Sequence, residues 1–162
     1  MKKLLFSLYK KVITLFYGSN LSKYSIVKKT TRYMTHKLHP EFVEIEGNKI
    51  YLDENDSLFL SSGILHEKTI VNLVKNEIKK GDVVIDIGAH IGYYTVLFAK
   101  LVGPKGRVFA FEASPTNFEI LKKNVNVNGY QNVTLNNKAV SDKDGKLTLY
   151  ITGRTSTENF LF

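Results

Sequence analysis

Two acidic side chains, each at the end of an apolar run, carry the strongest chemical signal in this sequence. Asp86 lies within the run 83–87, and Glu112 closes the run 106–112. A buried carboxylate is costly unless donors or a cation satisfy it. Because the carboxyl ends of parallel strands meet at one edge of a sheet, we expect both acids to face a ligand there. The alternative is that Asp86 stabilises the next turn by accepting hydrogen bonds from its backbone N–H groups.

A glycine-containing turn separates Asp86 from the next predicted helix. Gly88 allows a sharp change of direction, and Gly92 allows the helix to pack close to the strand or to a ligand. The spacing Gly88-x-x-x-Gly92 differs from the G-x-G-x-x-G pattern that binds the pyrophosphate of a dinucleotide. It suits a nucleoside without phosphates, such as S-adenosylmethionine (SAM). We expect Asp86 to meet the positive charge of SAM and the helix N-terminus to favour its carboxylate.

The acid after the second strand has a separate role. Glu112 is placed to accept hydrogen bonds from both ribose hydroxyls of an adenosine. That geometry serves NAD as well as SAM, so an NAD-type Rossmann protein is one alternative. The combination of Glu112 with Asp86, Gly88 and Gly92 favours SAM.

Two further turn residues, Ala89 and His90, are predicted to contact the cofactor through backbone or side-chain atoms. The alternative for His90 is a ring that faces solvent or a backbone carbonyl. A general-base role for His90 has little support, because nothing in the sequence locates the acceptor. The catalytic residues therefore stay unassigned.

The order of these motifs resembles the FkbM family of SAM-dependent methyltransferases. The similarity runs from about residue 81 to residue 150, through the segments 81–95, 109–115, 117–129 and 139–145. It implies a Rossmann-like class I SAM-methyltransferase fold and O-methylation of a hydroxyl on a sugar or other small metabolite. It also implies that the loop at Asp142 reaches the adenine amino group. A turn residue before a glycine is an equally consistent reading of Asp142.

The elements that must position these residues alternate along the chain. Strands are predicted over 83–87, 106–112, 132–140 and 146–152, helices over 66–80, 93–101 and 115–128, and a small β-hairpin over 41–53. This order favours a parallel sheet in a three-layer α/β/α arrangement, in which the strand 83–87 is covered on both faces. Ser114 and Pro115 predict the start of the last helix.

The positive charge of +8 is concentrated at the N-terminus. Residues 1–40 hold nine of the 23 Lys and Arg and none of the 15 Asp and Glu. We therefore divide the chain into a basic helical N-terminal arm, 1–40, and a SAM-binding methyltransferase domain, 41–162, whose nucleotide-binding core is 81–152. Residues 2–17 predict an amphipathic helix that either packs on the protein or makes a peripheral contact with an anionic membrane.

Composition and motifs limit the metals, nucleic acids and small molecules that we expect this protein to bind. The chain has no cysteine, and its four histidines lack metal-ligand spacing, so no metal site is predicted. No nucleic-acid module is recognisable, so we expect a small-molecule hydroxyl acceptor and no nucleic acid. We expect a cytoplasmic protein, peripheral at the inner face of the membrane if the arm binds lipid.

Three strands of the nucleotide sheet are fewer than family members have. We therefore expect a C-terminally incomplete domain that belongs to a longer reading frame. An incomplete sheet edge would promote self-association. An inactive fragment or a membrane-peripheral binding module is the non-enzymatic alternative.

Overall fold

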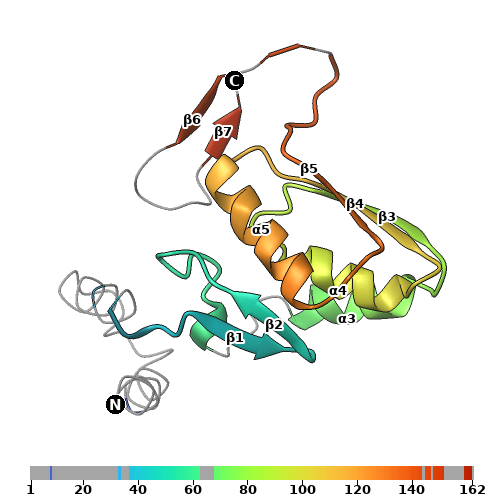
Figure 1. Cartoon of the computed structure of the whole chain (residues 1–162), viewed down its shortest axis with the longest axis horizontal. Helices are drawn as coiled ribbons and strands as arrows, with labels where there is room; N and C mark the ends of the chain where they lie inside the picture. The colour runs from blue at the N-terminus through green and yellow to red at the C-terminus, as the bar shows by residue number, and fades with distance from the viewer. Residues whose placement is uncertain are drawn as a thin grey trace.

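The structure is a computed structural model that describes residues 8, 33, 37–62, 68–143, 145, 146, 148–151 and 159–161 (Figure 1). Apart from residue 8, the predicted helix over 2–17 lies outside these residues, and so does its membrane contact. Within them, no helix is long and apolar enough to cross a membrane.

Three parallel strands form the central sheet in the order β3-β4-β5. They are β3 (Val83–Ile87), β4 (Arg107–Phe111) and β5 (Val133–Asn136). Helix α4 (Tyr93–Val102) connects the first two strands, and α5 (Pro115–Val127) connects the second pair (Figure 1). Parallel neighbours joined by helical crossovers confirm the predicted Rossmann-like α/β fold.

Helices cover one face of this sheet. Val108 and Ala110 of β4 are fully buried on that face. On β3, the side chains alternate in burial, and Val83, Ile85 and Ile87 are 65%, 61% and 64% exposed. The prediction that this strand is covered on both faces is therefore wrong for the described residues. Within them, β3 lies at the edge of the sheet, and the second helical layer of the predicted α/β/α arrangement is not seen.

We expect Ile85→Lys to reduce self-association of this chain. Its side chain lies at the centre of the exposed strip on β3, where a second copy could pair edge to edge, and a lysine there opposes that pairing. Little stability should be lost, because the isoleucine is mostly exposed. Light scattering coupled to size exclusion over a concentration series measures the effect. Asn126→Lys adds the same charge at an exposed position of α5, outside the sheet, and equal behaviour of both variants would contradict the prediction.

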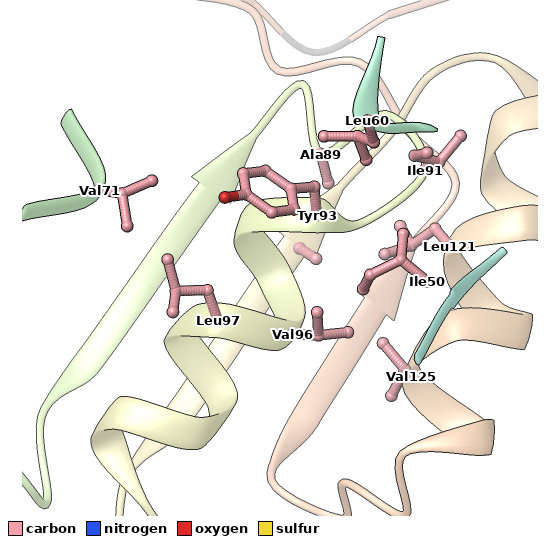
Figure 2. Close-up of a cluster of buried hydrophobic side chains, with 11 residues drawn as sticks. Ile50, Leu60, Val71, Ala89, Ile91, Tyr93, Val96, Leu97, Leu121 and Val125 are labelled. Atoms are coloured by element: carbon pink, nitrogen blue, oxygen red, sulfur yellow. The ribbon is translucent and has the colours of Figure 1, made fainter. Parts of the chain in front are cut away.

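The predicted hairpin is present as β1 (Phe42–Ile45) and β2 (Asn48–Tyr51). Its two turn residues, Glu46 and Gly47, both have positive φ, as a type I′ hairpin turn requires. The hairpin packs on α4 and α5. Figure 2 shows its Ile50 in the buried cluster with Ile91, Val96, Leu121 and Val125.

The remaining described elements lie outside the central sheet and the hairpin. They are a 3-10 helix η2 (Leu60–Ser62), α3 (Lys68–Glu77), β6 (Leu149–Ile151) and β7 (Asn159–Leu161). The strand predicted within 146–152 is thus present, but it pairs antiparallel with β7 in a separate two-stranded sheet. The central sheet therefore ends at β5 among the residues that are described.

Candidate cofactor-binding site

The turn between β3 and α4 contains three residues in the left-handed region. Gly88 has φ 78°, His90 has φ 52° and Gly92 has φ 88°. Glycine meets this requirement at two of the positions without steric cost, whereas His90 is strained. Gly92 is also the N-cap of α4. The turn conformation is therefore set by the glycine spacing noted in the sequence.

Backbone N–H groups of this turn converge on the end of β4. Gly88 and Ala89 both donate to the carbonyl oxygen of Phe111 at 2.9 Å, and His90 N–H donates to Oε2 of Glu112 at 2.8 Å. Oε1 of Glu112 accepts from Ser114 N–H, also at 2.8 Å. Glu112 is only 6% exposed. This carboxylate therefore joins the glycine turn to the start of α5.

The hydrogen-bond partner that the structure gives Asp86 is a side-chain hydroxyl and not a backbone N–H group. Oδ2 of Asp86 accepts a 2.6 Å hydrogen bond from the Thr95 hydroxyl in the first turn of α4. Burial raises the pKa of Asp86 above its ordinary value; the Thr95 hydrogen bond opposes this rise, and the Glu112 carboxylate adds to it. Two acidic groups that influence each other across one sheet edge favour a ligand with a positive charge.

The structure brings together six of the seven predicted site residues. They are Asp86, Gly88, Ala89, His90, Gly92 and Glu112. Asp142 is exposed beyond β5 and accepts from the Ser141 hydroxyl at 3.2 Å. Its role toward adenine stays a prediction.

Three polar residues that support the site were not singled out for it from the sequence. Thr95 is fully buried in an otherwise apolar part of α4, and this isolated polar residue could have signalled a buried partner. Ser114 caps α5 as predicted, but its N–H also holds Glu112. Asn137 donates from Nδ2 to the Glu112 carbonyl at 2.8 Å and so ties the chain after β5 to the site.

The residues present fit an adenosine with an attached positive charge. A carboxylate offers about four acceptor positions, so Glu112 can still accept from ribose hydroxyls beside its two N–H donors. Gly88 is exposed, and a Cβ atom placed there would meet no atom within 4 Å. There is thus room for a ligand against the turn, next to both carboxylates.

We expect Gly92→Ala to lower the free energy of unfolding by about 2–4 kcal/mol, since strain and overpacking add. A Cβ atom at this position would lie 2.5 Å from Cδ1 of Leu121, which is fully buried, and φ is 88°. Urea denaturation measures the loss. Gly88→Ala is the matched variant, because it has positive φ and open space, and strain alone should cost about 1 kcal/mol. Equal losses would show that contact with Leu121 is unimportant.

A parallel sheet with a glycine turn after one strand and a buried acid after the next defines a class of nucleoside-cofactor-binding α/β domains. A family model described as the TRM5/TYW2 methyltransferase domain matches residues 41–161. The chain belongs to this family of SAM-dependent methyltransferases. Membership confirms SAM as the cofactor and the broader part of the resemblance, whereas the narrower assignment to FkbM is not established.

Three curated relatives match part of the chain. A protein-L-isoaspartate O-methyltransferase of Ignicoccus hospitalis is 37% identical over 59 residues, 36% of this chain. The tRNA(Phe) (4-demethylwyosine(37)-C(7)) aminocarboxypropyltransferase of Methanocaldococcus jannaschii is 37% identical over 73 residues, 45% of this chain. The 31-O-demethyl-FK506 methyltransferase FkbM of Streptomyces tacrolimicus is 41% identical over 76 residues, 46% of this chain. Each match spans 28% of the relative's length.

Proposed function

We propose that this protein binds SAM at the edge formed by β3 and β4 and transfers its methyl group to an oxygen atom of a small acceptor. The observation that supports this most is the position of Glu112. Its buried carboxylate is fixed by N–H groups of His90 and Ser114 beside the glycine turn. It retains acceptor positions for the ribose hydroxyls.

The chain's own residues would bind and orient the reactants. Glu112 would fix the ribose, and Asp86 would lie near the positive charge of the cofactor. When bound, SAM supplies a sulfonium that activates its methyl group for displacement. The acceptor oxygen forms a bond to the methyl carbon as the sulfur–carbon bond breaks, and the acceptor's proton passes to a base or to solvent. Positioning and exclusion of water are the protein's main contributions to such a step.

An oxygen acceptor is supported by the names of two relatives. The Ignicoccus relative is an O-methyltransferase of protein L-isoaspartate, and the Streptomyces relative methylates 31-O-demethyl-FK506. A hydroxyl of a small molecule is the acceptor that we propose, in line with the second of these. The Methanocaldococcus relative supports a different reaction, which is transfer of an aminocarboxypropyl group to tRNA.

Calorimetric titration with SAM, beside NAD as a control, tests the cofactor. We expect SAM to bind and NAD to give no response. Incubation with SAM and hydroxylated metabolites, an isoaspartyl peptide or tRNA then tests the reaction. Methyl transfer yields S-adenosylhomocysteine, whereas aminocarboxypropyl transfer yields methylthioadenosine. A folded, monodisperse chain that does not bind SAM would refute the proposal.

A further inference from the structure

Asn124 of α5 lies between the hairpin and the glycine turn and is fully buried. Its Nδ2 donates to the Ile91 carbonyl at 2.7 Å and to the Tyr51 carbonyl at 3.0 Å. Its Oδ1 accepts from Tyr51 N–H at 2.7 Å. Both donors and the acceptor of this amide are therefore in use, and two segments distant in sequence meet at one side chain.

Asn128, one helical turn later, also accepts from and donates to the backbone of one residue of β2. Its Oδ1 accepts from Lys49 N–H at 2.8 Å, and its Nδ2 donates at 2.8 Å to the carbonyls of Lys49 and Asn124. Lys49 and Tyr51 are alternate residues of β2, so the two amides offer β2 the donors and acceptors of a neighbouring strand. Neither of the Asn128 partners is in the glycine turn. A comparison of Asn124 with Asn128 therefore distinguishes the effect of docking the hairpin from the effect of contact with the turn.

Ile91 is the residue of the glycine turn to which Asn124 donates a hydrogen bond and Asn128 does not. It is fully buried and lies between His90 and Gly92, both of which have positive φ. Glu112 holds the turn through His90 N–H, and Asn124 holds it one residue later through the Ile91 carbonyl. Without Asn124, that buried carbonyl would lose its side-chain donor, and the strained His90 would lose a constraint on its conformation.

We propose that Asn124 is a positioning residue of the cofactor site, which couples the docked hairpin to the conformation of the glycine turn. This inference rests on the proposed function, since the turn is taken to contact SAM. Asn124 itself is buried and acts through Ile91. The hairpin is in this way part of the support of the site, although it does not belong to the central sheet.

Asn124→Ala and Asn128→Ala form the test. Each variant loses two hydrogen bonds to one residue of β2, and only the first loses the bond to Ile91. Loss of a buried partner predicts a Kd for SAM about tenfold higher in Asn124→Ala, against a change within about twofold in Asn128→Ala. Both measurements are made at a temperature at which each variant is folded. Equal Kd values for the two variants would overturn the proposal.

Amide hydrogen exchange supplies a second readout that needs no cofactor. We expect faster exchange at His90 and Gly92 in Asn124→Ala than in Asn128→Ala, and equal rates would again overturn the proposal. If the wild-type chain does not bind SAM, the proposed function fails, while exchange still decides whether Asn124 holds the turn.

If Asn124→Ala does not fold, Asn124→Asp replaces it. A buried carboxyl tends to stay protonated and can then donate to Ile91 at low pH. We expect its SAM affinity, relative to wild type, to fall as pH rises, and the profile of Asn128→Asp to stay flatter. Identical profiles for the two aspartate variants would overturn the proposal.

Discussion

Glu112→Gln is expected to weaken SAM binding by about 100-fold, because it removes a charged acceptor of the ribose hydroxyls and loosens the glycine turn. The two carboxylate oxygens accept from different N–H groups, those of His90 and Ser114. A glutamine has one acceptor oxygen, so one N–H would face an amide NH₂ group and lose its partner. We therefore also expect the free energy of unfolding to fall by about 1–3 kcal/mol. Calorimetric titration and urea denaturation measure the two effects.

Glu119→Gln is the control for this substitution. Glu119 is an exposed residue of α5, and its carboxylate pairs with Lys122 at 3.5 Å on the helix surface. Exposed pairs of this kind contribute little, so stability should change by less than about 0.5 kcal/mol and SAM affinity should not change. If Glu112→Gln bound SAM as tightly as this control, the assignment of Glu112 to the ribose would be wrong.

Local sequence signals predicted the elements around the site well. The apolar run Val83–Ile87 has the bounds of β3, and Ser114 and Pro115 begin α5 as their capping chemistry predicts. The glycine spacing predicted a sharp turn at Gly88 and a close approach of the helix at Gly92, and the structure shows positive φ at both. These features depend on residues adjacent in the chain, which is why the sequence alone was sufficient.

Partners distant in the chain were not predictable in this way. The sequence indicated that Asp86 needs donors, but the choice of Thr95 depends on how α4 packs against β3. An apolar run also does not show whether both faces of its strand are covered, and β3 is open on one face in the described residues. Asn124 and Asn128 belong to the segments that carry the family resemblance. Their roles depend on the docking of β2 on α5, which brings together residues distant in the chain.

Asp86→Asn is expected to stabilise the protein by about 1 kcal/mol at pH 7.5 while it weakens SAM binding, as often happens when a functional residue is replaced. Burial raises the pKa of the Asp86 carboxyl in the folded protein. For a raised pKa, the favourable contribution is fully present below the unfolded-state value, about 4, and is lost as pH rises through the folded-state pKa. At a pH above that folded-state pKa, the wild type therefore bears a cost for its desolvated carboxylate. The asparagine retains an acceptor for the Thr95 hydroxyl without that charge.

The pH dependence distinguishes this origin from a general change in packing. The gain in unfolding free energy of Asp86→Asn over wild type should be small near pH 4 and grow toward pH 7.5. Asp56 also has a pKa raised by burial, but it is present in both proteins, so its effect largely cancels in the difference at each pH. Urea denaturation at several pH values gives the curve, and calorimetry at pH 7.5 should show SAM binding about tenfold weaker, the usual scale for losing one charge-assisted contact. A variant less stable than wild type at pH 7.5 would contradict the desolvation cost, and SAM affinity equal to that of wild type would contradict the placement of Asp86 against the cofactor's positive charge.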